Sequence, residues 1–367
     1  MKISDIFDNG TDILKKFSSF FKKEEQKSDD DKFLDTRPCK RPFEYFSIEN
    51  NGDVYPCCKE FLKYGTSAGN IEKHDFQEIW NGKMLTDLRK RMINSDFSMC
   101  DREGGCIYEP YHDGTVPSGY EKGPKEIKIG YDYECNYNCI TCRDMIKINM
   151  SDELEKYNEV YLPKIIEIAK NTECVGLLMG GEPLFSRHSK HLIQELIKAY
   201  PDIEFNLFTN GVFLTEENLK SLGIQNNIRG LSVSVDAATR ETYKIIHRAD
   251  EFDNVVKNLE LMAEWKNKGK INWITINFVV HLLNYKEMPA FAELAQKLGV
   301  VAFFSTYRPW VSAEYNLKYE TAAVFERENK HYDDFVNMLK NSVFKDKNHC
   351  ILEPCIFEIV YADLLYN

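Results

Sequence analysis

Residues 126–142 read EIKIGYDYECNYNCITC and decide the fold class, because an apolar strand pattern runs directly into closely spaced cysteines. Cys135, Cys139 and Cys142 are separated by three and then two residues. In α/β proteins built from parallel strands, the loops that follow the strands are where binding and catalytic groups collect. The stretch therefore predicts a loop that carries a site, placed directly after the first strand of such a fold.

The segments that follow this stretch alternate between strand and helix patterns. Strands are expected at 126–133, 173–180, 203–208, 229–236, 271–280 and 300–305. Amphipathic helical segments fill the intervals between them. Six such alternations predict an α/β fold with a parallel sheet covered by helices, over residues 123–310. Residues 311–367 are expected to form a helical extension that contains cysteines.

Composition excludes several functional classes. The 367 residues suffice for one large domain or two of ordinary size. The net charge of −11 argues against a nucleic-acid partner, because binding a phosphate backbone requires a basic surface. No stretch approaches the roughly 20 apolar residues of a membrane span, and the start lacks a signal peptide, so we expect a cytoplasmic protein. Residues 1–34 are interpreted as a charged leader and linker.

The eleven cysteines are the main chemical clue. A reducing compartment keeps thiols free for metal binding or catalysis. Three ligands from Cys135, Cys139 and Cys142 would leave one corner of a [4Fe–4S] cube without a protein ligand, so that iron can take an external chelator. A structural zinc site is the alternative, although zinc prefers a closed tetrahedral ligand set.

Residues 125–310 resemble the radical S-adenosylmethionine (SAM) superfamily, which has three cysteines in this spacing after the first strand of a partial (β/α)6 TIM-like barrel. Further segments carry the resemblance: MGGEPLF, FTNG, SVSVDAATRETYKIIHR and NFVVHLLNYKEM. The resemblance implies that SAM is bound by Gly180, Gly181, Glu182, Pro183, Asn210, Ser234, Asp236 and Arg248. A glycine pair lets the backbone approach a ligand closely, and the adjacent carboxylate suits the SAM ammonium group.

Residues 35–122 form a second, cysteine-rich module. FEYFSIENNGDVYPC predicts a β-hairpin with its turn at Asn51 and Gly52. The pattern from Cys39 to CDREGGC is similar to SPASM and twitch domains, so a small α+β module would precede the barrel. The resemblance implies one or more auxiliary [4Fe–4S] clusters, for which the ligands would be Cys39, Cys57, Cys100 and Cys106. A structural zinc site on the same four thiols is the alternative.

Several other residues remain open in function. Cys58 is interpreted as a candidate catalytic acid or base, a hydrogen-atom donor, an alternative cluster ligand or an inert packed thiol. Cys350 and Cys355 are interpreted either as auxiliary-cluster ligands or as buried thiols, and Cys174 as a core residue. Candidates to shape a substrate pocket are His281, Tyr285, Tyr307, Arg308 and Trp310.

The resemblance implies an enzyme with SAM and a [4Fe–4S] cluster as cofactors. One electron from the cluster would cleave SAM to methionine and a 5′-deoxyadenosyl radical, which abstracts hydrogen from a peptide, protein or sugar-like substrate. The auxiliary cluster would transfer electrons, and a flavodoxin or ferredoxin would act as donor. The alternative is a non-catalytic electron carrier or interaction protein that binds iron–sulfur or zinc.

Overall fold

The computed structural model describes residues 36–57, 62–101, 106, 108–177, 180–309, 316–357 and 359. The predicted leader at 1–34, Cys58 and Trp310 lie outside the described residues. The chain divides into two compact units. The first unit extends to Tyr133 and also contains Asn149–Leu207 and Leu222–Arg229, and the second contains Glu134–Ile148, Phe208–Ser221 and the chain from Gly230 onward.

The strands of the first unit follow the order β6-β5-β4-β1-β2-β3. Their bounds are β1 (Tyr45–Ile48), β2 (Asp53–Tyr55), β3 (Gly69–Asn70), β4 (Glu126–Ile129), β5 (Cys174–Leu177) and β6 (Glu204–Thr209). Only the part of β6 from Glu204 to Leu207 belongs to this unit. β1, β4, β5 and β6 pair in parallel, whereas β1, β2 and β3 pair antiparallel. Every residue of β1 is buried, as expected for a strand covered on both faces.

The pairing of β1 with β4 joins the N-terminal module to the first predicted barrel strand. Tyr45 pairs with Glu126, and Ile48 pairs with Ile129. The sequence predicts the hairpin of β1 and β2 but gives no sign of this parallel pairing, because the two strands are about 80 residues apart in the chain. The first compact unit consequently spans the predicted boundary at 122/123, and the domain boundaries remain predictions.

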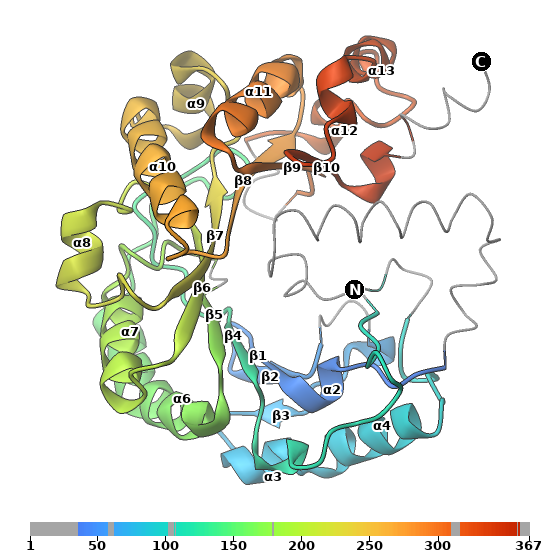
Figure 1. Cartoon of the computed structure of the whole chain (residues 1–367), viewed down its shortest axis with the longest axis vertical. Helices are drawn as coiled ribbons and strands as arrows, with labels where there is room; N and C mark the ends of the chain where they lie inside the picture. Colours follow the sequence, from blue (N-terminus) through green and yellow to red (C-terminus); the bar gives the residue numbers. More distant parts are fainter. Residues whose placement is uncertain are drawn as a thin grey trace. The chain divides into compact units, whose positions relative to one another are not determined.

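Helices of the first unit cover its strands. In Figure 1, α6 and α7 lie along the strands β4, β5 and β6. The α-helices are α2 (Arg41–Glu44), α3 (Phe76–Trp80), α4 (Lys83–Ile93), α5 (Ser151–Lys156), α6 (Leu162–Ile168) and α7 (Arg187–Ala199). The shorter turns are the 3₁₀ segments η3 (Lys63–Gly65), η4 (Tyr120–Lys122) and η6 (Ala169–Asn171), and the π-helical segment η5 (Tyr157–Tyr161).

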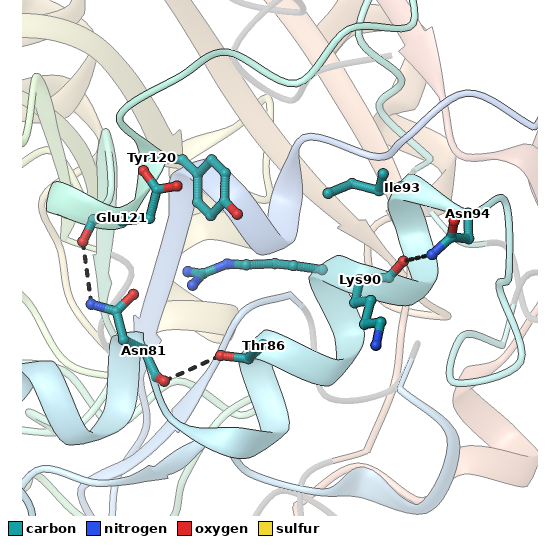
Figure 2. A pocket seen from close by; sticks show the side chains of 8 residues that line it. Asn81, Thr86, Lys90, Ile93, Asn94, Tyr120 and Glu121 are labelled. Carbon is teal, nitrogen blue, oxygen red and sulfur yellow. Dashed lines mark hydrogen bonds between the residues drawn. The ribbon is translucent and has the colours of Figure 1, made fainter.

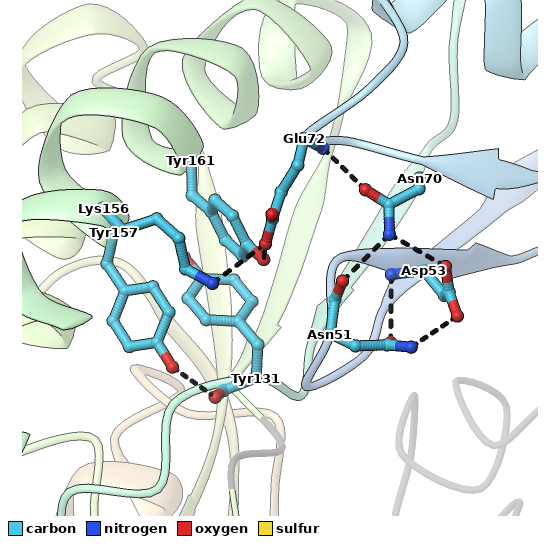
Figure 3. A network of polar contacts seen from close by, with 8 residues as sticks. All are labelled: Asn51, Asp53, Asn70, Glu72, Tyr131, Lys156, Tyr157 and Tyr161. Atoms are coloured by element: carbon cyan, nitrogen blue, oxygen red, sulfur yellow. Dashed lines mark hydrogen bonds and ion pairs between the residues drawn. The ribbon is translucent and has the colours of Figure 1, made fainter. Parts of the chain in front are cut away.

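The predicted hairpin turn is confirmed. Gly52 has a φ of 79°, a conformation that favours glycine, and its backbone N–H donates to the Glu49 carbonyl. Side chains of Asn51, Asp53 and Asn70 hydrogen-bond to one another around the turn (Figure 3). A Cβ atom on Gly52 would lie 2.8 Å from the Tyr161 hydroxyl, so the turn packs directly against η5.

A polar contact next to this turn links the N-terminal module to the helices that follow β4. The Tyr161 hydroxyl donates a hydrogen bond to Glu72, and Lys156 forms a 3.0 Å ion pair with the same carboxylate (Figure 3). These bonds lower the pKa of Glu72, against the effect of its partial burial. The hairpin, Glu72 and η5 therefore pack as one region of the first unit.

The second unit contains four parallel strands in the order β10-β9-β8-β7. Their bounds are β7 (Ile228–Ser234), which belongs to this unit from Gly230 onward, β8 (Trp273–Val280), β9 (Val301–Thr306) and β10 (Cys350–Leu352). The helices are α8 (Glu216–Ser221), α9 (Arg240–His247), α10 (Phe252–Asn267), α11 (Met288–Leu298), α12 (Tyr319–Ala322) and α13 (Tyr332–Leu339), with 3₁₀ segments η7 (Tyr285–Glu287) and η9 (Ser342–Lys345). Residues 311–367 were expected to be helical, but β10 adds a strand to the sheet.

The predicted mixed α/β class is confirmed, with a mostly parallel sheet and helices between the strands. All six expected strands form, within a few residues of the predicted limits. The largest difference is at 126–133, where β4 ends at Ile129 and the next residues form the approach to the cysteine loop. The chain leaves the sheet early because buried polar contacts hold Asp132, whose carboxylate accepts hydrogen bonds from Asn149 and Ser189.

Gly230→Ala is expected to lower the free energy of unfolding by about 1–3 kcal/mol through overpacking. Gly230 lies opposite Trp273 on β8, and a Cβ atom would come within 1.8 Å of the indole ring. Urea unfolding measures the change. Gly230→Ala in a Trp273→Leu background is the control, because Gly230 has no positive φ and the smaller side chain at 273 removes the overlap with the added Cβ. Equal losses in the two variants would contradict the packing explanation.

Candidate functional site

The cysteine loop folds back on itself within the second unit. A β-bridge joins Cys135 to Lys147, and the Cys135 N–H donates to the Lys147 carbonyl at 2.9 Å. The Cys142 N–H bonds the Cys139 carbonyl at 3.0 Å, which forms a tight turn between the second and third cysteines. All three thiols are half-buried. This arrangement presents three sulfur atoms from one short loop, as the sequence predicts.

Helix α9 anchors the loop through contacts that sequence reasoning missed. Cys139 Sγ lies 3.1 Å from His247 Nδ1, and His247 Nε2 lies 2.9 Å from the Val235 carbonyl oxygen. A carbonyl only accepts, so Nε2 carries the proton and Nδ1 accepts from the thiol. The Ile140 N–H donates to the carbonyl of Ile246 in the same helix. The only sequence signal was the HR pair at the end of YKIIHR.

The electrostatics of the loop suit a cationic iron–sulfur group. The pKa of Cys139 is raised, first by burial and then by the nearby sulfurs of Cys142 and Cys135. The Arg143 guanidinium donates to Cys142 Sγ at 3.4 Å. Iron would relieve the mutual repulsion of the thiolates, and N–H donors to sulfur are common around such clusters. The loop therefore fits a [4Fe–4S] cluster.

A site for a single metal ion, such as zinc, would need a different arrangement of ligands from a [4Fe–4S] cluster. Across the residues that the structure describes, no three His, Cys, Asp or Glu side chains converge closely enough to hold a metal ion. In a cubane cluster each cysteine binds a different iron, so the three sulfurs are spaced more widely than the ligands of one zinc ion.

Asn210, a predicted SAM contact, lies next to the cysteine loop. Its Nδ2 donates to Asn136 Oδ1 at 2.9 Å, and its Oδ1 accepts from the Val212 N–H. Gly211, which follows, has a φ of 82°. Asn210 thus positions the loop between Cys135 and Cys139, and its contact with SAM remains a prediction.

Ser234, Asp236 and Arg248 flank the same region. Ser234 ends β7, and Asp236 follows with a φ of 58°, an unusual conformation for a residue other than glycine. Asp236 Oδ1 accepts from the Val279 N–H at 2.7 Å, and burial raises the pKa of Asp236 to about 7. Arg248 also has a positive φ and donates to Asn316 Oδ1 at 2.6 Å. Their roles toward SAM remain predictions.

The GGEP segment lies in the first unit, between β5 and α7. Gly180 packs so closely on the Tyr133 ring that an added Cβ would come within 2.2 Å of it. Glu182 is 1% exposed, and its Oε1 accepts from the Leu184 N–H at 3.1 Å. The Glu182 carbonyl accepts from Ser186, whose hydroxyl caps α7. A buried, oriented carboxylate beside a close backbone approach is chemically suited to an ammonium group.

A buried histidine lies behind this segment. His188 Nε2 is 2.6 Å from the Tyr131 hydroxyl, and His188 Nδ1 is 2.8 Å from Asn158 Oδ1. Burial lowers the pKa of His188 to about 4 from its usual 6.5. The imidazole is therefore neutral in the folded protein near neutral pH.

Acid is expected to destabilise the protein partly through His188. The unfolded state binds a proton at the usual pKa of 6.5, and the folded state binds it only near 4. Stability is therefore complete above pH 6.5 and is lost as the pH falls toward 4. His188→Gln should reduce the loss between pH 7 and 4.5 by on the order of 2 kcal/mol, measured by urea unfolding. An unchanged pH slope would contradict the assignment.

Two cysteines of the N-terminal module, Cys39 and Cys57, interact with a buried ion pair. Arg41 pairs with Glu109 at 2.9 Å, and the Arg41 charge acts on both Cys39 and Cys57. Cys39 forms a β-bridge with Pro110, and Cys100 forms one with Leu62. Burial raises the pKa of Cys39. Cys57, Cys100 and Cys106 are half-buried, and ligation of a cluster by these four cysteines remains a prediction.

Arg89 of α4 hydrogen-bonds to backbone carbonyls of the helices α2 and α3. Its Nε donates to the Pro42 carbonyl at 2.8 Å and its Nη1 to the Trp80 carbonyl at 2.6 Å. The guanidinium lies 4.1 Å from the centre of the Trp80 ring. Burial lowers the pKa of Arg89 to about 10. A cavity of about 340 Å³ adjoins it, lined by α4 and η4 side chains that include Tyr120 and Glu121 (Figure 2).

The remaining cysteines are separate from the loop at 135–142 in the chain. Cys174 is buried in β5, as expected for a core residue, and burial raises its pKa. Cys350 is buried in β10, whereas Cys355 is exposed and its thiol lies 3.7 Å from the Thr306 hydroxyl. Whether Cys350 and Cys355 ligate a cluster remains a prediction. Arg308 pairs with Glu353 at 2.6 Å, near the end of β9.

Two family models match the chain in the places where the cysteines cluster. Residues 133–295 match the radical SAM superfamily, and residues 39–106 match the iron–sulfur cluster-binding domain SPASM. The chain carries a radical SAM domain preceded by a SPASM domain. The predicted family and domain order are thereby confirmed. The radical SAM domain implies SAM and a [4Fe–4S] cluster as cofactors, and the SPASM domain implies auxiliary iron–sulfur clusters.

Relatives of known name match over part of their length. A probable GTP 3′,8-cyclase of Saccharolobus islandicus is 30% identical over 48% of this chain and 54% of its own length. A GTP 3′,8-cyclase of Synechocystis is 26% identical over 50% of this chain and 54% of its own length. The chain thus spans about half the length of these relatives.

Solved structures also resemble the chain. SuiB of Streptococcus suis, bound to SAM, has a TM-score of 0.43 with 13% identity, covering 77% of this chain and 58% of its own. HemN of Escherichia coli, a coproporphyrinogen III oxidase, has a TM-score of 0.39 with 13% identity, covering 59% of this chain and 53% of its own.

Among the described residues, no helix is both long and apolar enough to cross a membrane.

Proposed function

We propose that this protein is a radical SAM enzyme that abstracts hydrogen from a peptide, protein or sugar-like substrate. The observation that carries the proposal is the loop of Cys135, Cys139 and Cys142, whose three half-buried thiols follow a parallel strand in the chain and in which Cys139 contacts His247 of α9. When bound, the cluster and SAM would supply the 5′-deoxyadenosyl radical that abstracts the hydrogen atom.

The chain's own residues would bind, orient and shield the reacting groups. Cys135, Cys139 and Cys142 would hold the cluster, and the Asn210–Asn136 bond would fix the loop. Glu182 would bind the SAM ammonium group, since it is a buried carboxylate beside a close backbone turn. Ser234, Asp236 and Arg248 are the proposed contacts for the SAM ribose and carboxylate.

The SPASM cysteines would hold an auxiliary cluster for electron transfer. Arg41 places a positive charge near both Cys39 and Cys57, and this charge opposes the effect of burial, which raises the pKa of Cys39. A flavodoxin or ferredoxin would deliver the electrons. The relatives are named for GTP, but they share only about half of this chain, so a nucleotide is tested beside the peptide and sugar-like classes.

The test is anaerobic assay of protein reconstituted with iron and sulfide. SAM and dithionite are added, and 5′-deoxyadenosine is quantified for the wild type and for Cys135→Ala. Product from the wild type alone is expected, and it should increase with the correct substrate from a panel of peptides, sugars, aminocyclitols and GTP. A colourless, zinc-loaded protein would contradict the proposal, and a coloured protein that never forms product would favour an electron carrier.

A further inference from the structure

His281 is a fully buried histidine at the carboxyl end of β8, with 0% of its surface exposed. The Leu283 backbone N–H donates to His281 Nδ1 at 3.2 Å. His281 Nε2, by contrast, has no hydrogen-bond partner among the residues that the structure describes. One side of the ring is therefore fixed by the backbone, and the other carries a buried polar atom to which nothing described is bonded.

The first contact determines what this polar atom is. An N–H group only donates, so Nδ1 is the acceptor and a neutral ring must carry its proton on Nε2. Burial lowers the pKa of His281 to about 3, with a smaller effect from His247, so the ring is neutral under working conditions. His281 therefore presents one buried N–H donor. Leaving such a donor unpaired costs about 1–3 kcal/mol.

Neighbouring polar groups are already engaged. Asn284 Oδ1 accepts from the His281 backbone N–H, and Asn284 Nδ2 donates to the carbonyls of Asp236 and Val279. The Tyr307 hydroxyl donates to the Leu317 carbonyl, and its ring meets the imidazole edge to face at 6.2 Å. Small rotations of these groups would break existing bonds. The partner of Nε2 is more simply supplied by a bound molecule.

The surroundings indicate which molecule this is. His281 interacts electrostatically with His247, and His247 contacts both Cys139 and Val235. Asn284 connects the His281 backbone to Asp236, which is a proposed SAM contact. The donor thus lies in the part of the second unit that would hold SAM. A neutral N–H suits uncharged acceptors, such as an adenine ring nitrogen or a ribose oxygen.

We propose that His281 Nε2–H donates a hydrogen bond to the adenosyl half of bound SAM. The proposal rests on the proposed function, because it assigns a further binding residue to that site. In the ligand-free protein the buried N–H of His281 is unpaired, which costs stability. Binding of SAM would remove this cost by supplying an acceptor. A buried polar group without a partner in a native protein needs an explanation, and a bound molecule is one such explanation.

The test compares His281→Phe with the wild type after cluster reconstitution and without reductant, so that SAM is not consumed. SAM affinity is measured by equilibrium dialysis, and it is expected to fall about 10- to 100-fold when this hydrogen bond is lost. The affinity for S-adenosylhomocysteine should fall by the same factor, because it carries the same adenosyl group. The affinity for methionine should be unchanged. The melting temperature without ligand should be unchanged or higher, because the variant no longer buries an unpaired donor.

Two further variants separate the possible outcomes. His281→Gln keeps an N–H donor and an acceptor and should recover much of the affinity. Thr275→Val, on the same strand, should leave affinity unchanged. Equal SAM affinity in wild type and His281→Phe, or a lower melting temperature with unchanged affinity, would overturn the proposal and assign the donor to internal packing or a buried water. A wild type that binds no SAM would instead refute the proposed function.

Discussion

Cys139→Ala is expected to lose one cluster's share of iron and sulfide, together with the spectral response to SAM, after reconstitution. Cys139 is the middle cysteine of the loop and a proposed cluster ligand, and its Sγ contacts His247. Two remaining thiolates leave two irons of the cube without a protein ligand, so the cluster is not retained. Iron analysis and electron paramagnetic resonance with and without SAM measure the change. Auxiliary clusters should remain and keep the protein coloured.

Cys174→Ala is the matched control for this experiment. Cys174 is a buried cysteine in the core strand β5, whereas Cys139 is half-buried and lies in the loop. Its removal should cost some stability and leave the iron content and the SAM response intact. A Cys139→Ala protein with wild-type iron content and SAM response would show that the three cysteines are not the ligands.

Arg89→Ala is expected to lower the free energy of unfolding by about 3–5 kcal/mol, because two carbonyls lose a charged donor and are left unpaired. The guanidinium bridges the Pro42 and Trp80 carbonyls and packs on the Trp80 ring. Arg89→Lys should recover little, since a single ammonium lacks the planar fork that reaches both carbonyls. Chemical unfolding, followed by far-ultraviolet circular dichroism, measures both variants.

Arg91→Ala is the matched control on the same helix. Arg91 pairs with Asp96 at 2.6 Å, but both side chains are well exposed. Exposed ion pairs contribute little to stability, so this variant should unfold almost as the wild type does. A similar loss in the Arg89 and Arg91 variants would mean that helix α4, rather than the buried bridge, determines the effect.

Local patterns predicted most of the elements. The six apolar segments form strands, and Asn51-Gly52 forms the hairpin turn, because these features depend on residues close together in the chain. The strand β10 was missed because CIL is too short to show a period and is stabilised by pairing with β9. The strand expected at 126–133 was too long, since distant polar groups hold Asp132 off the sheet.

In the candidate site, too, the sequence predicted the residues that lie close together in the chain and missed the contacts between distant ones. Spacing alone placed Cys135, Cys139 and Cys142 in one loop. The role of the GGEP segment came from the family resemblance, and only the structure shows that its Glu182 is buried. His247 was missed because its contact with Cys139 spans 108 residues. His281 was noted only as one of several residues near strand ends, and its unpaired Nε2 is visible only when the neighbours are placed around it.

The sequence by itself determined the alternation of strands and helices and the close spacing of three cysteines in one loop, because these depend on residues near one another in the chain. The order of the two domains followed from the family resemblance of its motifs. Only the tertiary structure decided the pairing of β1 with β4, the contact of α9 with the cysteine loop and the burial of Arg89 and His281. These features are contacts between residues far apart in the chain. They are determined by packing and hydrogen bonding in the folded state, so they cannot be read from local sequence patterns.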